Sequence, residues 1–233
     1  MTQQVLNSAT KVGNQKTSLF PFSVCASHLT FAISAKRLLP LLAPCVACLL
    51  SLLCMYRYFI KTPRWVRLLF PYYLWRIATE KKEVYLTFDD GPHPHITPWV
   101  LDELDKYKAK ATFFCVGSNV AKYDAVYQRL LYEGHAVGNH THTHINGWKT
   151  DTATYLKDVA EAAVYIHSNL FRPPYGKIKR RQAKGIANAL GKKEAHIVMW
   201  DVLSADFDQN ITPEKCLQNV LKNTTAGSVI VFH

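Results

Sequence analysis

The chain has 233 residues, of which 48% are hydrophobic, and a formal net charge of +11. This length and this apolar content are enough for one domain with a hydrophobic core, and they exclude a chain that is disordered throughout. The positive charge belongs to the N-terminal part, because residues 82–233 contain 18 basic and 16 acidic residues. A nucleic-acid-binding domain would carry its own basic excess, so we predict no nucleic-acid partner.

The part of the chain before residue 82 divides into three segments by composition. Residues 1–37 are polar and predicted to be disordered, residues 38–56 are almost entirely apolar, and residues 57–81 form a basic and aromatic lead-in. The apolar segment is a candidate transmembrane helix, because about 18 apolar residues is the lower limit for crossing a bilayer. Basic residues flank it on both sides, so the positive-inside rule does not orient it. We predict a membrane-associated protein of the cell envelope, with membrane contact through residues 38–81.

Met55 is an alternative start of the protein. It opens a basic and aromatic stretch that leads directly into the first predicted strand, and residues 1–54 would then be an upstream extension of the gene model. With this start the protein would be cytoplasmic. A cleavable signal peptide fits less well, because 37 residues precede the apolar run and no small-x-small cleavage site follows it.

From residue 82 onward, strand and helix patterns alternate, which predicts an α/β domain with largely parallel strands. Alternating patterns and short apolar runs predict strands at 84–88, 111–116, 134–138, 170–171, 196–200 and 228–233. Helical patterns predict helices at 97–107, at 120–133, at 151–169, before Gly191 and at 212–222. Two of these helices begin with Thr-Pro, at Thr97 and Thr212, which places an N-cap residue before a proline at the first helical position.

Two adjacent carboxylates, Asp89 and Asp90, end the first predicted strand, and a Gly91-Pro92 turn follows them. Neighbouring strand residues point to opposite faces, so the two carboxylates can serve different partners. Held close together, they repel each other unless a cation or hydrogen bonds relieve them. An Asp-Asp-Gly sequence alone is most often an exposed turn. The pair therefore predicts a functional site only in combination with the other motifs.

A run of histidines follows the third predicted strand, with His140, His142 and His144 at alternating positions. Neutral imidazoles are the commonest zinc ligands, and two or three in one short segment can bind one ion. Asp90 could complete a His/His/Asp set that leaves one position open for water, as catalytic zinc sites do. The alternative is a polar loop in which the histidines occur by chance.

Three further segments lie at or just beyond the ends of predicted strands. Arg172 offers a permanent charge to a carboxylate, and the two prolines after it present the N–H of Tyr175 rigidly. Acidic residues from Asp201 to Asp208 follow another strand, and His233 follows the last apolar run. Each segment alone fits a turn or a solvated loop. Together they converge on the carboxyl ends of the strands, where parallel α/β folds build their active sites.

These segments resemble, in order, the five motifs of the polysaccharide deacetylases, which are the NodB-homology domains of carbohydrate esterase family 4. The matching stretches are TFDDGP, H-T-x-x-H, R-x-P-Y, the segment 200–207 and the terminal hydrophobic-His pair, and they lie within residues 82–233. The resemblance implies a distorted (β/α) barrel, usually with seven strands. It also implies a divalent metal ion, commonly zinc.

The resemblance implies a role for each matching residue. Three would be the metal ligands, namely Asp90, His140 and His144. Asp89 would be the general base, and Arg172 would orient it. His233 would be the general acid, with Asp206 tuning its acidity, and the N–H of Tyr175 would help to hold the oxyanion.

The sequence departs from the family pattern in three places. Leu203 stands where the fourth motif usually has an acid and Phe207 where it has a tryptophan, which changes a groove wall and leaves the substrate preference open. His142 is an extra histidine between two ligands, expected to be exposed or to lie behind the metal ligands. The chain stops at His233, where family members continue, so we expect a domain that is truncated at its C-terminus.

The predicted function is that of a metal-dependent hydrolase in carbohydrate metabolism. It would remove N-acetyl groups from N-acetylated sugars of a polysaccharide or amino-sugar oligomer, and so break a carbon–nitrogen bond other than a peptide bond. Two alternatives stay open, because the residues allow both. One is an O-acetyl polysaccharide esterase that uses the same site, and the other is a truncated domain that binds metal or glycan without catalysis.

Overall fold

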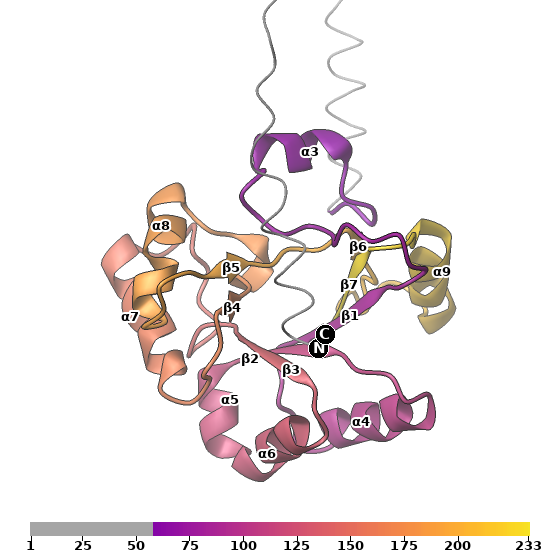
Figure 1. The fold of residues 1–233 in the computed structure, drawn as a ribbon, viewed down its shortest axis with the longest axis horizontal. Coiled ribbons are helices and arrows are strands. Elements are labelled where there is room, and N and C mark those ends of the chain that lie inside the picture. The colour runs from indigo at the N-terminus through magenta and orange to yellow at the C-terminus, as the bar shows by residue number, and fades with distance from the viewer. Residues whose placement is uncertain (1–57) are drawn as a thin grey trace, which may run out of the picture. The chain divides into compact units, whose positions relative to one another are not determined.

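The structure is a computed structural model, and it describes residues 58–233 (Figure 1). The predicted disordered segment 1–37 and the predicted transmembrane segment 38–56 lie outside these residues. Within the described part of the chain, no helix is both long enough and apolar enough to cross a membrane. For residues 58–81, the described part of the segment predicted to contact the membrane, this finding corrects the prediction of a transmembrane helix.

In residues 58–233 seven parallel strands form one sheet, which confirms the predicted α/β fold with seven strands. The strands are β1 (Tyr85–Asp89), β2 (Thr112–Cys115), β3 (Ala136–Asn139), β4 (Leu170–Phe171), β5 (His196–Ile197), β6 (Val202–Leu203) and β7 (Val229–Phe232). Their order across the sheet is β5-β4-β3-β2-β1-β7-β6, and every neighbouring pair is parallel. Sequence patterns missed β6, because two apolar residues between Asp201 and Ser204 are too few to show a strand period.

Helices lie around the outside of the sheet (Figure 1). They are α3 (Arg64–Leu69), α4 (Ile96–Lys106), α5 (Gly117–Lys122), α6 (Asp124–Tyr132), α7 (Thr152–Ala163), α8 (Arg180–Ala189) and α9 (Pro213–Asn223), with a short 3-10 helix η1 (Pro174–Gly176). Most of them alternate with the strands along the chain, which is the arrangement that parallel strands require.

Local contacts decide where three of the predicted helices begin or break. The predicted N-cap Thr97 lies inside α4, because the side chain of His93 accepts hydrogen bonds from two N–H groups at the start of the helix and so caps it. The predicted helix 120–133 is interrupted at Tyr123, where φ is −125° and ψ is 47°. Thr212 caps α9 as predicted, since its side chain accepts a hydrogen bond from a first-turn N–H.

Both faces of the sheet are buried. On one face Phe113 of β2 packs against Leu101 of α4 and Leu130 of α6. Phe114 points to the opposite face, as the next residue of a strand must, and lies there beside Val198. The strands therefore offer only their carboxyl and amino ends for polar chemistry.

A segment that precedes β1, residues 60–77, lies along both edges of the sheet, and we call it the strap. Leu74 donates a backbone hydrogen bond to Ile197 at 2.9 Å and accepts one from Met199 at 2.8 Å, so it pairs with the end of β5. At the other edge the strap joins β6 through an antiparallel bridge at Lys61. The strap thus covers the backbone groups that the edge strands would leave unpaired.

Candidate metal centre and active site

The sequence-predicted site residues lie at the carboxyl ends of the strands. Asp89 is the last residue of β1 and Asp90 follows it, while the next residues after β3, β4 and β7 are His140, Arg172 and His233. Because all the strands are parallel, these positions fall on one edge of the sheet. The fold therefore gathers side chains that are far apart in the sequence.

Asp90, His140 and His144 form a compact cluster. The Oδ1 atom of Asp90 lies 3.4 Å from Nε2 of His140 and 3.0 Å from Nε2 of His144. One ligand atom from each residue lies within 4.8 Å of the other two, which is the arrangement that a metal ion requires. Two imidazoles and one carboxylate leave a coordination position open, as catalytic zinc sites do.

The hydrogen bond behind His140 prepares its ring for a metal. Nδ1 of His140 lies 2.7 Å from the carbonyl oxygen of Arg172. A carbonyl oxygen can only accept, so Nδ1 must carry the proton and Nε2 presents its lone pair toward Asp90. Metal-binding histidines are oriented by bonds of this kind. The chemistry of the donor set and the tautomer of His140 therefore both fit a divalent metal ion.

The electrostatics of the cluster keep Asp90 ionised. In the metal-free cluster burial alone would raise the pKa of Asp90, but hydrogen bonds from the protonated rings of His140 and His144 and their positive charges outweigh burial. The pKa of this carboxyl therefore lies far below the usual range for aspartate. An ionised carboxylate is the form that binds a metal ion.

The backbone around the site adopts a conformation that residues with a side chain rarely take. Asp90, Thr141, His144, Tyr175 and Ala205 all have φ between 57° and 67°. Left-handed backbone costs free energy in such residues and persists only where the surrounding structure enforces it. These strained positions lie in the loops that hold the predicted site residues.

Arg172 holds Asp89 in a buried ion pair. Its Nη1 donates to Asp89 Oδ1 at 2.7 Å, and both side chains are almost completely buried. Three further donors of the guanidinium bind Thr87 Oγ1 and the carbonyl oxygens of Val198 and Met199, at 2.7 to 3.1 Å. A guanidinium that makes four hydrogen bonds keeps one geometry, so it fixes the position of the Asp89 carboxylate.

His233 and Asp206 form a second pair, which is half-buried. Nδ1 of His233 lies 2.9 Å from Asp206 Oδ1, and the backbone N–H of His233 donates to Oδ2 at 2.8 Å. Burial alone would lower the pKa of His233, but the hydrogen bond to Asp206 and the charges of Asp89, Asp206 and Asp90 outweigh it and raise the pKa. The surroundings of His233 therefore favour the protonated form of its imidazole.

Two residues of the histidine and proline loops point in different directions. Tyr175 lies in η1 and packs edge-on against the ring of His144, with centroids 4.7 Å apart. His142 turns away from the cluster, since its Nε2 lies 3.3 Å from Glu161 and its ring stacks on Tyr165. The structure thus brings together all the sequence-predicted site residues and leaves the extra histidine outside.

Sequence patterns missed Asp158, which supports the histidine loop. Its carboxylate accepts hydrogen bonds from the backbone N–H groups of His142 and Thr143 and from the Thr143 hydroxyl, at 2.6 to 3.1 Å. The signal was present, because Asp158 lies on the apolar face of α7 between Tyr155 and Val159. A lone acid on an apolar helix face needs a polar partner, and here that partner is the loop with the candidate metal ligands.

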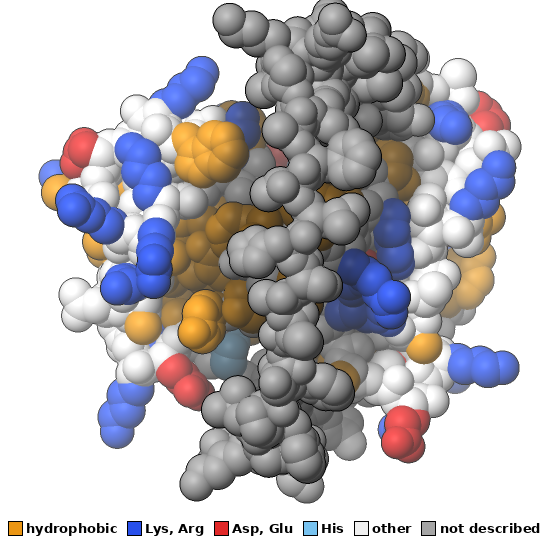
Figure 2. All heavy atoms as spheres, turned by 90° about the horizontal axis from the view of Figure 1, so that it is seen from above, with side chains coloured by type: hydrophobic (Ala, Val, Ile, Leu, Met, Phe, Trp, Pro, Cys, Tyr) orange, Lys and Arg blue, Asp and Glu red, His pale blue; other side chains and the backbone are white. Residues whose placement is uncertain are grey.

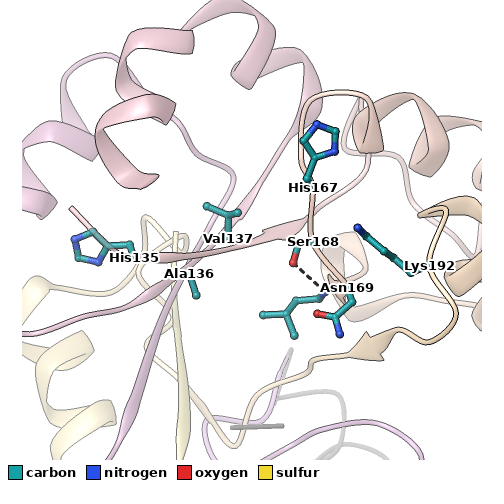
Figure 3. A pocket seen from close by; sticks show the side chains of 8 residues that line it. His135, Ala136, Val137, His167, Ser168, Asn169 and Lys192 are labelled. Atoms are coloured by element: carbon teal, nitrogen blue, oxygen red, sulfur yellow. Dashed lines mark hydrogen bonds between the residues drawn. The ribbon is translucent and has the colours of Figure 1, made fainter. Parts of the chain in front are cut away.

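A second group of polar residues lies at the opposite ends of the same strands. A pocket of about 470 Å³ is lined by the residues around the starts of β3 and β4, together with His167 and Lys192 (Figure 3). His135 lies at its rim, and its Nδ1 accepts a hydrogen bond from the Ala111 N–H at 3.2 Å. This pocket is separate from the metal cluster, since the two lie at opposite ends of parallel strands.

Comparisons with known proteins point to one family. The sequence pattern described as "Polysaccharide deacetylase" matches residues 76–195. The chain is 36% identical over 159 residues to a peptidoglycan-N-acetylglucosamine deacetylase of Bacillus cereus, covering 66% of this chain and 56% of the relative. It is 32% identical to a chitooligosaccharide deacetylase of Azorhizobium caulinodans, covering 68% of this chain and 76% of the relative. The chain thus spans little more than half the length of the Bacillus cereus protein.

A solved structure agrees with these relatives. The crystal structure of the Bc1960 peptidoglycan N-acetylglucosamine deacetylase superimposes with a TM-score of 0.65 at 34% sequence identity, and the match covers 74% of this chain and 80% of that one. The resemblance predicted from the five motifs is confirmed by both the sequence pattern and the fold. The chain belongs to the polysaccharide deacetylase family.

Proposed function

We propose that this protein removes N-acetyl groups from N-acetylated sugars of a polysaccharide, using a divalent metal ion. The observation that carries the proposal is the Asp90, His140 and His144 cluster, which lies between a buried carboxylate and a hydrogen-bonded imidazole. The relatives are named as deacetylases of peptidoglycan and of chitooligosaccharide. We infer that the substrate is a glycan of the cell envelope and that the protein works there.

The metal would be held by Asp90, His140 and His144, and we propose zinc because two imidazoles and a carboxylate are its usual ligands in catalytic sites. When bound, zinc polarises a carbonyl group and lowers the pKa of a bound water. The tautomer of His140 and the ionised Asp90 both support this assignment.

We assign the general base to Asp89. Arg172 binds its Oδ1, so the carboxylate is held in place while Oδ2 accepts the proton of the attacking water. The same guanidinium stabilises the carboxylate before the proton arrives. The N–H of Tyr175 donates to the oxygen of the acetyl group as negative charge develops there.

We assign the general acid to His233. Its Nδ1 is bonded to Asp206, so Nε2 delivers the proton to the leaving amine. The products are acetate and a free amino sugar. The hydrogen bond to Asp206 and the nearby carboxylates raise the pKa of His233 despite its burial, which favours the protonated ring that this role needs.

The test combines metal content with acetate release. The full chain, with and without added zinc, is incubated with N-acetylglucosamine oligomers and with O-acetylated xylan, and acetate is measured. We expect acetate from the first substrate. Acetate from xylan alone would identify an O-acetyl esterase instead, and no acetate from either substrate despite bound metal would contradict the proposed reaction.

Variants separate the two carboxylates. Asp90→Ala and His140→Ala should abolish metal binding, whereas Asp89→Asn should keep the metal and lower turnover by about 10² to 10⁴-fold. His142→Gln is the matched control, because this histidine turns away from the cluster and should leave the metal content unchanged. Equal loss of metal in Asp89→Asn and Asp90→Ala would contradict the division of roles.

A further inference from the structure

Two loops leave the metal centre side by side, at residues 144–150 and 175–181. At their inner end the rings of His144 and Tyr175 are in edge-to-face contact. Further out, Gly147 packs so closely on the second loop that a Cβ there would collide with its backbone. The two loops therefore form one continuous wall, which we call the loop wall, and it begins at a proposed metal ligand.

Trp148 lies at the outer end of the loop wall, and 61% of it is exposed. Its Nε1–H donates to the Ile178 carbonyl oxygen at 3.3 Å, and its backbone N–H donates to Asn146 Oδ1 at 3.0 Å. Lys177 stands over the ring, with Nζ 5.6 Å from the ring centroid. A large ring that is exposed and yet held in place presents a flat apolar face, and the C–H face of a sugar can stack on such a face.

The loop wall is basic along its whole length. Its two loops contain five cationic residues and no acidic ones, namely Lys149, Lys177, Lys179, Arg180 and Arg181. Figure 2 shows Lys and Arg side chains on both sides of the viewed face, including the side where Figure 1 places α7 and α8. Asp89 and Asp90 lie at the inner end of the wall, so an anionic group is favoured beside the reacting acetamide and not at it.

We infer that Trp148 and Lys177 form a subsite for a carboxylate-bearing sugar unit next to the sugar that is deacetylated. Trp148 stacks on the ring of this unit, and Lys177 pairs with its carboxylate. The inference rests on the proposed function and selects a substrate within it. A glycan that alternates N-acetylglucosamine with a carboxylate-bearing amino sugar binds better than a neutral N-acetylglucosamine oligomer.

The test measures binding, so that it does not depend on turnover. The full chain carrying Asp89→Asn is titrated by calorimetry with three tetrasaccharides that share one backbone. The first carries free carboxylates on alternate sugars, the second has these carboxylates converted to methylamides, and the third carries them on short peptides attached to the sugars. The measured quantity is the dissociation constant of the methylamide divided by that of each charged ligand.

We expect a ratio of about five for the free-acid ligand, as a partly exposed ion pair would give. Lys177→Gln should bring the ratio to about one, and Lys177→Arg should restore it because the charge is kept. Trp148→Ala should weaken the binding of all three ligands by about five-fold. A high ratio for the peptide-bearing ligand alone would place the recognised carboxylate on the peptide.

Two control variants lie at the other ends of the strands. Lys192→Gln removes a lysine beside the opposite pocket, and Tyr132→Ala removes an exposed ring at the end of α6. Both should leave the ratio and the dissociation constants equal to those of the chain that carries Asp89→Asn alone. Melting temperatures check that every variant is folded.

A ratio of one in the parent, or a ratio that Lys177→Gln does not change, would overturn the inference. Acetate release by the wild-type chain is measured in parallel. Acetate release together with a ratio that does not depend on Lys177 would support the proposed reaction and contradict the subsite. A ratio that depends on Lys177 without any acetate release would support the subsite and contradict the proposed reaction.

Discussion

Two carboxylate–cation pairs accompany the candidate metal centre, and they differ in burial and in chemistry. The side chains of Asp89 and Arg172 are 4% and 0% exposed, whereas those of Asp206 and His233 are 26% and 25% exposed. Arginine keeps its charge at every working pH, while histidine exchanges a proton near neutrality. The buried pair therefore suits a fixed position, and the half-exposed pair suits proton transfer.

The largest effect is expected when the buried pair is broken. Arg172→Ala leaves the Asp89 carboxylate buried without a counter-charge, and removing one partner of such a pair costs about 3–5 kcal/mol of stability. Urea unfolding of the metal-free protein measures this loss. Arg172→Lys keeps the charge and loses the planar fork, so its loss should be smaller. Equal losses in the two variants would show that charge compensation is not the reason.

Breaking the half-exposed pair should change the reaction more than the fold. Asp206→Asn removes the charge that helps to raise the pKa of His233, so the decline of kcat on the alkaline side should move to lower pH. Turnover should fall by about 10²-fold, the usual contribution of a positioned acid. The profile of kcat against pH measures both effects. Asp208→Asn is the control, since this acid lies on the same loop and accepts hydrogen bonds from Asn210.

The same pair should make a pH-dependent contribution to stability. Burial would raise the pKa of Asp206, but its hydrogen bonds to His233 outweigh burial and lower the pKa. The contribution of Asp206 to the unfolding free energy is therefore lost as the pH falls through this lowered pKa. The pKa of His233 is raised, so the contribution of His233 to the unfolding free energy is lost as the pH rises through this raised pKa. The difference in unfolding free energy between wild type and Asp206→Asn should be largest between about pH 4 and 6.5. It should stay below about 1 kcal/mol, because the pair is partly exposed. A difference that is constant up to pH 9 would contradict the ion pair.

The smallest effect is expected when Ser204, which supports the half-exposed pair, is changed. The Ser204 hydroxyl donates to Asp206 Oδ1 at 2.8 Å and orients this carboxylate. Ser204→Ala should cost about 1 kcal/mol of stability or less, as one hydrogen bond does. Turnover should fall less than in Asp206→Asn, and the alkaline decline of kcat should keep its position. A shift as large as that of Asp206→Asn would place Ser204 in the proton transfer itself.

Sequence patterns were sufficient where neighbouring residues carry the signal. The alternation before Asp89 predicted β1, and the rule that active sites lie at the carboxyl ends of parallel strands brought Asp90, His140 and Arg172 to one edge. The capping residue Thr212 was predicted for the same reason, since a cap depends on its own turn. Local chemistry therefore explains most of the fold and the choice of site residues.

Sequence patterns failed where the signal comes from distant contacts. The sequence offers Arg172 as a cation, but its carbonyl acceptors belong to the segment after β5. The sequence alone shows Asp158 only as a residue of a helix, because its hydrogen-bond partner in the histidine loop lies 16 residues away along the chain. The two-residue strand β6 forms because β7 lies beside it, which no short window can show.

The strap has a consequence for anyone who handles this domain in isolation. The motifs of the family begin with β1, so residue 82 looks like a natural place to cut. The carbonyl oxygens that hold Arg172 belong to Val198 and Met199, and Leu74 of the strap is bonded to that same stretch. A domain excised at residue 82 would lose this support and expose two bare sheet edges, which invite aggregation. Grafts and fusions should therefore carry residues 60–77 with the catalytic domain.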